Sequence, residues 1–217
     1  MSIEFYEYVG SPTCLATKML LEHLKIPFNS RIIALHADEQ LKPEFLKINP
    51  AHVLPTIIDN GFVLWESRTI NRYLVNQYAP GDNLYPNDPK KQAIVDRMLD
   101  FDLGSLYEYV TRWIFPVHFE KKPKDDEKEK AMSEKLKLFD HLLSKSQYAA
   151  GDNLTLADFS LLTSVSVVCA TLHDLNQYPN IKSWMNRLES ELPYYKELME
   201  PHLTSLKTAF ARSFPLK

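Results

Sequence analysis

The sequence is poor in cysteine and contains no long apolar run. Only two of its 217 residues are cysteines, Cys14 and Cys169, which lie far apart and indicate neither a disulfide framework nor a zinc site. No stretch reaches the roughly 18 consecutive apolar residues of a membrane span, and the N-terminal residues lack the basic patch and apolar run of a secretory signal. We therefore expect a cytoplasmic protein of a reducing compartment, with no membrane partner.

Neither sign of charge dominates the sequence. The formal net charge is −3, with acidic and basic residues interspersed, which argues against nucleic acid or an anionic membrane as the main partner. The mixed charge run at 121–130 is expected to form a solvated loop and the start of a helix. A hydrophobic share of 45% is typical of a soluble globular protein, and 217 residues suffice for one large domain or two small ones.

Residues 1–80 alternate short apolar runs with helical patterns. The expected elements are a strand at 4–9, a helix at 12–24, a strand at 31–35, a helical turn at 43–47, strands at Thr56–Asp59 and Phe62–Trp65, and a helix at Ser67–Tyr78. Adjacent Ile32 and Ile33 predict a second strand buried on both faces. Asn60-Gly61 supplies the positive φ angles of a type I′ hairpin turn. This order predicts a small mixed sheet covered by helices.

The remainder of the chain has a different pattern. Residues 81–88, which include Gly81 and Pro86, are expected to be a linker, and residues 89–217 an all-helical domain. The expected helices span 89–113, 134–144, 156–172, 181–191 and 194–203. Pro116 is expected to kink or end the first of them. Thr155 and Asp158 predict a capping box, which gives Asp158 a structural rather than a catalytic role.

The first strand runs into Ser11-Pro12-Thr13-Cys14, where a thioredoxin-like fold carries a Cys-x-x-Cys redox pair. Because serine replaces the first cysteine, Cys14 cannot form a disulfide within this motif. The Ser11 hydroxyl can instead donate a hydrogen bond to a sulfur anion above the helix N-terminus, where free N–H groups favour negative charge. The alternative is that Ser11 only caps the helix.

Two further clusters follow. A cis Leu54-Pro55 bond would turn the backbone groups of Leu54 toward a cleft, where an extended peptide could pair with them as an added strand. His52 beside this turn could bind a carboxylate, or be an ordinary surface residue.

At the next strand-to-helix junction, Glu66 could hold an ammonium group, and Ser67 and Arg68 a carboxylate. The alternative is a capping serine flanked by surface charges. Together, the thiol stabiliser, the pairing edge and the amino-acid clamp suit a cysteine-containing tripeptide.

These residues also carry a family resemblance over nearly the whole chain. The sequence resembles the cytosolic glutathione transferases, and looks most like the insect delta and epsilon classes. The segments that carry the resemblance are 10–11 (GS), 42–50 (KPEFLKINP), His52, 55–56 (PT), 59–61 (DNG), 64–68 (LWESR), 84–86 (LYP), 148–152 (YAAGD) and 154–158 (LTLAD).

The resemblance implies a thioredoxin-like N-terminal domain followed by an all-helical C-terminal domain, in a homodimer. It implies glutathione as co-substrate, no tightly bound cofactor and no metal, with Ser11 as the catalytic residue. The glutathione-binding residues that it implies are Ser11, Gln40, His52, Val53, Leu54, Pro55, Glu66, Ser67, Arg68 and Asp102.

Some positions depart from the family pattern. Pro12-Thr13 stands where related delta sequences often have Ala-Pro, and Gln40 stands where a histidine is common. Many relatives use a tyrosine as activator, and Tyr8, next to the matching position Glu7, is an alternative of that kind.

An apolar site for a second substrate is expected along the long helix and the C-terminal segment. Its candidates are Leu103, Tyr107, Val110, Phe115, Phe119, Leu203, Leu206 and Phe210, any of which could instead belong to the bundle core. Tyr107 and Phe115 match substrate-site positions of delta relatives. The expected function is conjugation of the glutathione thiolate to small hydrophobic electrophiles, in xenobiotic or insecticide detoxification. The alternatives are a non-catalytic carrier of hydrophobic ligands and a thiol-disulfide oxidoreductase that uses Cys14.

Overall fold

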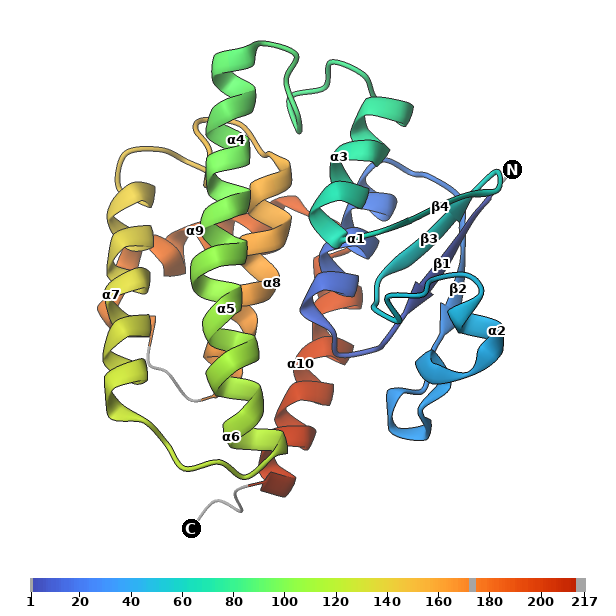
Figure 1. Cartoon of the computed structure of the whole chain (residues 1–217). Coiled ribbons are helices and arrows are strands. Elements are labelled where there is room, and N and C mark those ends of the chain that lie inside the picture. Colours follow the sequence, from blue (N-terminus) through green and yellow to red (C-terminus); the bar gives the residue numbers. More distant parts are fainter. Residues whose placement is uncertain (1, 172–174, 214–217) are drawn as a thin grey trace.

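The computed structural model describes residues 2–171 and 175–213, in which a small sheet with its helices stands beside a helical bundle (Figure 1). The described strands are β1 (Ile3–Glu7), β2 (Phe28–Ile32), β3 (Thr56–Asp59) and β4 (Phe62–Trp65), in the order β2-β1-β3-β4. β1 is parallel to β2 and antiparallel to β3, and β3 and β4 form the predicted hairpin. Asn60 and Gly61 have φ angles of 48° and 86°, which confirms the predicted turn chemistry.

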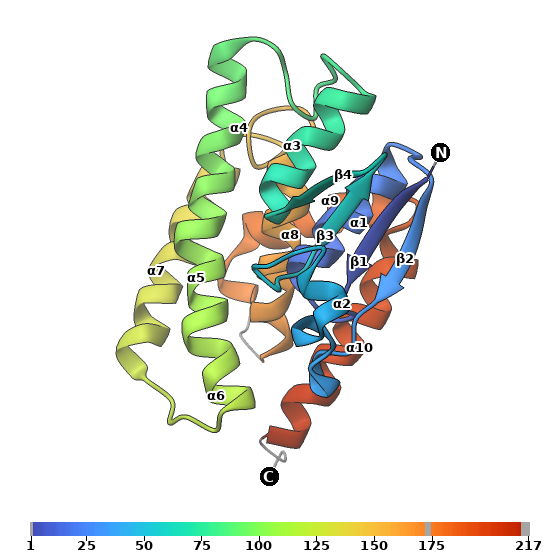
Figure 2. The same cartoon turned by 45° about the vertical axis from the view of Figure 1, so that its right-hand side comes forward.

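Helices cover both faces of this sheet (Figure 2). α1 (Pro12–His23) and α3 (Ser67–Tyr78) lie between the sheet and the bundle, and the short α2 (Pro43–Leu46) lies on the other side. The alternation of β1 fits this arrangement: Phe5 is fully buried, whereas the Tyr6 ring faces Phe45 of α2 at 5.7 Å. A buried hydrogen bond of 2.9 Å from Thr17 to Asn71 joins α1 to α3. The thioredoxin-like arrangement expected from the sequence is thereby confirmed.

The second strand differs from its prediction. It spans Phe28–Ile32 rather than 31–35, because Ile3 N–H bonds to the Pro27 carbonyl at 3.0 Å and so sets the register of β2 against β1. β2 is an edge strand, and Ile32 is 54% exposed. The expected burial of this strand on both faces is therefore wrong.

The bundle begins with a long helical rod that runs from residue 89 to residue 119 (Figure 1). Its segments are α4 (Pro89–Phe101), a π-helical stretch (Asp102–Leu106), α5 (Tyr107–Tyr109), a second π-helical stretch (Val110–Ile114) and α6 (Phe115–Phe119). Pro116 was expected to kink or end this helix, but the rod continues past it to Phe119. The turn before the proline is π-helical, with Phe115 N–H bonded to the Val110 carbonyl, and its wider geometry accommodates a residue that lacks an N–H.

The other bundle helices are α7 (Asp126–Leu143), α8 (Leu156–Ala170), α9 (Pro179–Glu191) and α10 (Tyr195–Ser213), with a 3₁₀ turn at Leu175–Gln177. α7 begins earlier than expected, because Asp125 caps it by accepting from the N–H groups of Glu127 and Lys128, each at 3.1 Å. α10 continues past the expected end at residue 203. The expected end of α8, Leu172, lies outside the described residues.

α8 is the central helix, and α1, α4 and α10 all pack against it. The predicted capping box at its start is present. Asp158 is fully buried and accepts hydrogen bonds from the N–H groups of Ala149 and Thr155 and from Trp184 Nε1, at 2.8–2.9 Å. These contacts confirm a structural role for Asp158. They join the loop before α8, the start of α8, and α9.

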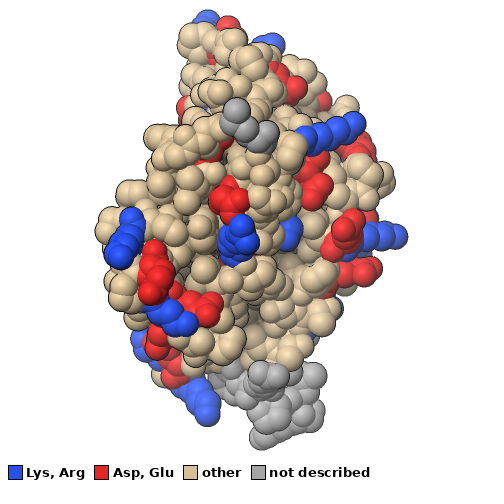
Figure 3. All heavy atoms as spheres, turned by 90° about the vertical axis from the view of Figure 1, so that its right-hand side faces the viewer, with Lys and Arg blue, Asp and Glu red and all other residues tan. Residues whose placement is uncertain are grey.

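Acidic and basic side chains are interspersed on the face shown in Figure 3, with broad uncharged areas between them. Within residues 2–171 and 175–213, none of the helices has the length and apolar character needed to cross a membrane.

Candidate active site

Ser11 stands at the N-terminus of α1, directly after the loop that leaves β1. Its N–H bonds to the Tyr8 carbonyl at 3.1 Å, and its Oγ accepts from Cys14 N–H at 3.3 Å and lies 3.0 Å from Thr13 Oγ1. The backbone before it passes close to α10, since a Cβ at Gly10 (φ 96°) would lie 2.8 Å from Ser205 Oγ. Ser11 is thus a helix cap, as the alternative interpretation required, but its half-buried hydroxyl still has one proton to donate.

Cys14 lies one turn into α1 and is 1% exposed. Burial raises the pKa of its thiol to about 12, so the group is protonated at neutral pH. The Cys14 thiol is neither exposed nor ionised, which argues against thiol-disulfide chemistry at this residue.

The loop before β3 is held by a buried asparagine. Asn49 Nδ2 donates to the Val53 carbonyl at 3.1 Å and to Thr56 Oγ1 at 2.9 Å, and its Oδ1 accepts from Ala51 N–H at 2.9 Å. These bonds hold the expected cis Leu54-Pro55 peptide and leave His52 exposed at a positive φ of 47°. Asn49 was identified from the sequence only as part of the 42–50 segment. Its signal was a lone amide next to Pro50, at the entrance to the loop.

The third cluster lies where β4 passes into α3. Glu66 has a φ of 71°. Its side chain is exposed and makes no capping hydrogen bond to the start of α3. Ser67, the first residue of α3, is 6% exposed, and its Oγ lies 3.5 Å from Arg68 Nη1. An exposed carboxylate beside an uncapped helix N-terminus can receive an ammonium group and a carboxylate together.

Arg68 joins the two domains. Its Nε donates to Asp102 Oδ2 at 3.1 Å, its Nη2 bonds to the same oxygen, and its guanidinium lies 5.1 Å from the Tyr107 ring centroid. Asp102 is fully buried, and burial raises the pKa of its carboxyl against the opposing charge of Arg68. Two donors of the Arg68 fork are therefore directed to Asp102, and the residue is placed to position Ser67.

An aromatic cluster lies where the end of the rod meets α10. Phe119 is 54% exposed and packs against Phe115 at 5.5 Å and Phe210 at 5.9 Å between ring centroids. His118, which the sequence analysis did not single out, stacks on Phe210 at 4.1 Å. Burial lowers the pKa of His118, and the nearby charge of Lys124 adds to that shift. The cluster offers an apolar surface with one polar ring.

Comparison with known proteins places this arrangement in a family. Residues 1–76 match the family model of the glutathione S-transferase N-terminal domain, and residues 102–191 match that of the C-terminal domain. The chain belongs to the glutathione S-transferase family. The resemblance drawn from the sequence, and the expectation of a glutathione transferase, are confirmed.

Solved insect structures resemble this transferase over nearly its full length. A delta-class enzyme of Nilaparvata lugens is 38% identical, with a TM-score of 0.94 over 97% of this chain and 99% of that one. An epsilon-class enzyme of the housefly Musca domestica is 31% identical, with a TM-score of 0.92 over 98% and 99%. A glutathione transferase homologue from Drosophila mojavensis, solved with bound glutathione, is 32% identical, with a TM-score of 0.91 over 98% and 97%.

Not all predicted site residues of the transferase share one place. Val110 is 0% exposed and lies in the bundle core, so it offers no surface to a substrate as the structure stands. Phe210, in the aromatic cluster, is only 5% exposed, whereas Leu103 is 47% exposed. Gln40 is half-buried, and its Oε1 has no hydrogen-bond partner among the described residues.

Tyr107 lies between the domains of the transferase. Burial raises the pKa of its phenol, and a hydrogen bond with Thr13 and the charge of Arg68 oppose that shift.

Tyr8 follows the last residue of β1, so strand alternation does not extend to it.

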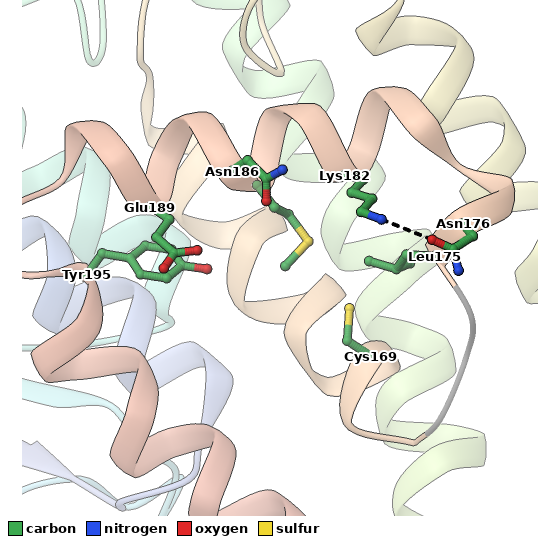
Figure 4. Close-up of a pocket in the computed structure, with 8 residues that line it drawn as sticks. Cys169, Leu175, Asn176, Lys182, Asn186, Glu189 and Tyr195 are labelled. Atoms are coloured by element: carbon green, nitrogen blue, oxygen red, sulfur yellow. Dashed lines mark hydrogen bonds between the residues drawn. The ribbon is translucent and has the colours of Figure 1, made fainter.

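A cavity of about 390 Å³ lies away from these residues, between the end of α8, α9 and the start of α10 (Figure 4). Cys169 and Tyr195 line it, and Lys182 donates to Asn176 across one end at 3.0 Å. Burial raises the pKa of Cys169 to about 12, so its thiol supplies no nucleophile at neutral pH.

Proposed function

We propose that this transferase adds the thiolate of glutathione to small hydrophobic electrophiles, with Ser11 donating a hydrogen bond to the sulfur. The observation that carries the proposal is the position of Ser11 at the N-terminus of α1, with its Oγ accepting from Cys14 N–H so that its proton can point outward. Ser11 stabilises an anion in this scheme and is not itself a nucleophile.

The energies involved are sufficient. Lowering the pKa of a thiol by two units needs about 2.7 kcal/mol. A hydrogen bond to a charged group contributes about 1.5–3 kcal/mol, and a helix N-terminus about 0.3–1 kcal/mol. The serine and the start of α1 can therefore keep bound glutathione ionised near neutral pH without any metal or redox group.

The other residues hold the tripeptide in place. The backbone of Leu54 pairs with the cysteinyl residue, and His52 and Gln40 take the glycyl carboxylate. Glu66 and Ser67 bind the γ-glutamyl end, and Arg68 with Asp102 positions them. Val53 and Pro55 complete the wall of the site.

The electrophile is proposed to approach from the aromatic side, along Tyr107, Phe115 and Phe119. Suitable classes are aryl halides, epoxides and organophosphates, which fits xenobiotic or insecticide detoxification. Holding thiolate and electrophile together supplies the proximity that the addition needs. We propose a cytoplasmic homodimer, which sedimentation equilibrium and cell fractionation test.

The decisive variant is Ser11→Ala. We expect kcat/KM for a generic aryl halide to fall by about 10- to 100-fold, the value of one hydrogen bond to an anion. Glutathione affinity, measured by calorimetry, should change little. Ser190→Ala, on the exposed side of α9, is the matched control. Equal turnover in Ser11→Ala and the wild type would exclude Ser11 as the activator.

A carrier remains the second candidate, because the aromatic cluster would bind hydrophobic molecules with or without catalysis. Binding of a hydrophobic dye by the wild-type protein, with no conjugation above the uncatalysed rate, would favour the carrier.

A further inference from the structure

Ser11 is linked to the peptide-pairing loop through one side chain, Thr13. Thr13 Oγ1 lies 3.0 Å from Ser11 Oγ and 3.5 Å from the carbonyl oxygen of Leu54. The proposed function uses Ser11 and Leu54 separately and gives Thr13 no part. Its hydroxyl nevertheless touches the group that would activate the sulfur and the group that would receive the ligand backbone.

The number of protons available decides what these contacts can do. A hydroxyl has one proton to donate and two lone pairs to accept with. If Thr13 donates to Leu54, its oxygen is free to accept the Ser11 proton, which then points away from the cleft. If Thr13 donates to Ser11, the Thr13 and Cys14 donors occupy both lone pairs of Ser11 Oγ, and the Ser11 proton is left for the sulfur.

The two distances indicate how a ligand selects between these states. The Thr13–Leu54 contact of 3.5 Å is at the limit of a hydrogen bond, whereas the Thr13–Ser11 contact of 3.0 Å is well within it. A peptide N–H that pairs with the Leu54 carbonyl would compete with this long contact for the carbonyl oxygen.

We propose that Thr13 is a positioning residue that transmits occupation of the Leu54 carbonyl to the Ser11 hydroxyl, so that the Ser11 proton faces the sulfur only when the peptide backbone is seated. This inference rests on the proposed function. It adds that the thiol is activated by correct docking of the cysteinyl backbone, and not merely by proximity to the serine.

Thr13→Val removes the hydroxyl and keeps the shape, and Thr13→Ser keeps the hydroxyl. We expect the pKa of bound glutathione, read from thiolate absorbance without an electrophile, to rise by about 0.4 to 1 unit in Thr13→Val, the value of one neutral hydrogen bond. Below that pKa, kcat should fall by about 2.5- to 10-fold while KM for glutathione changes less. Thr13→Ser should restore the wild-type pH profile.

The charged groups around this corner are the same in both variants. The Glu7–Lys18 salt bridge lies at the end of β1 and on α1, and the Arg68–Asp102 pair lies between the domains. The thiol of Cys14, with a pKa of about 12, does not titrate in the range measured. A rise in the pKa of bound glutathione that occurs in Thr13→Val but not in Thr13→Ser is therefore due to loss of the Thr13 hydroxyl and its contact with Ser11.

A modified ligand tests the link without changing the protein. Glutathione methylated on its cysteinyl amide nitrogen cannot donate to Leu54. In the wild type we expect its bound thiol to have a higher pKa than that of glutathione, and Thr13→Val to add no further shift. This comparison also serves if Thr13→Val folds poorly, which thermal melting would show.

Equal thiol pKa values in the wild type, Thr13→Val and Thr13→Ser would overturn the inference, as would equal losses in both variants. If Ser11→Ala loses activity while Thr13→Val matches the wild type, this inference fails and the proposed function stands. If the wild type ionises no glutathione, the proposed function itself fails.

Discussion

At the scale of single residues, the site depends on side chains that hold neighbouring groups in place through hydrogen bonds. Ser11, Asn49 and Arg68 each hold a backbone or charged group at a fixed place, and each lies within a few residues of a backbone with unusual geometry. The sequence motifs identified Ser11 and Arg68. They could not show that Asn49 is 0% exposed, or that two Arg68 donors are directed to Asp102, because burial and pairing depend on distant segments.

Asn49 offers a test of the pairing loop. Asn49→Ala removes three hydrogen bonds and leaves the buried Thr56 hydroxyl and Val53 carbonyl with fewer partners. We expect the free energy of unfolding to fall by about 2–3 kcal/mol and glutathione binding to weaken, because the loop before β3 loses these hydrogen bonds.

Chemical denaturation and calorimetry measure these two effects of Asn49→Ala. Asn76→Ala, on the exposed side of α3, is the control and should change neither the free energy of unfolding nor the affinity for glutathione. Unchanged glutathione affinity in a destabilised Asn49→Ala would separate the loop from the binding site.

At the scale of elements, local chemistry predicted some starts and turns, although it missed the Asp125 cap that starts α7. The Asn60-Gly61 hairpin, the start of α3 at Ser67 and the capping box of α8 follow from residues within a few positions of each other, and the structure confirms them. The register of β2 depends on its pairing with β1, the rod passes Pro116 through a π-helical turn, and α10 continues to Ser213; in these three places the predicted bounds were wrong.

The docking of α10 on α8 predicts a pH dependence. His202 on α10 is 2% exposed and shares a 3.1 Å hydrogen bond with Ser166 on α8, and burial lowers its pKa to about 4. The unfolded chain binds a proton at this histidine near pH 6.5. Since the unfolded state binds more protons between these values, His202 contributes stability that is present above pH 6.5 and is lost as the pH falls toward 4.

The size of this loss is about 3 kcal/mol at most. His202→Gln should flatten the fall in melting temperature between pH 6.5 and 4.5, whereas His141→Gln, at an exposed position on α7, should leave it unchanged. Identical pH profiles for His202→Gln and the wild type would show that other groups cause the acid instability.

At the scale of the whole molecule, the site lies where two domains meet, and one buried ion pair crosses that boundary. The pairing of Arg68 with Asp102 brings the start of α3 against the rod, and Tyr107 lies over the guanidinium. The family resemblance implied that Asp102 belongs to the glutathione site. Charge patterning alone could not predict that Arg68 pairs with Asp102, because 33 residues lie between the two partners in the chain.

Asp102→Ala leaves the Arg68 charge buried without a partner, which should lower the free energy of unfolding by about 3–5 kcal/mol. The double variant Arg68→Met/Asp102→Leu removes both charges and should recover much of that stability. If the pair positions Ser67, the double variant should not recover glutathione affinity, as urea denaturation and calorimetry would show. Full recovery of affinity would make the ion pair a structural link only.

The central claim is that the Ser11 hydroxyl stabilises the thiolate of bound glutathione, and its most direct test is the pKa of that thiol. Thiolate absorbance of the glutathione complex, followed against pH without an electrophile, should give a pKa about one to two units lower in the wild type than in Ser11→Ala. Equal pKa values in the two complexes, each saturated with glutathione, would contradict the account.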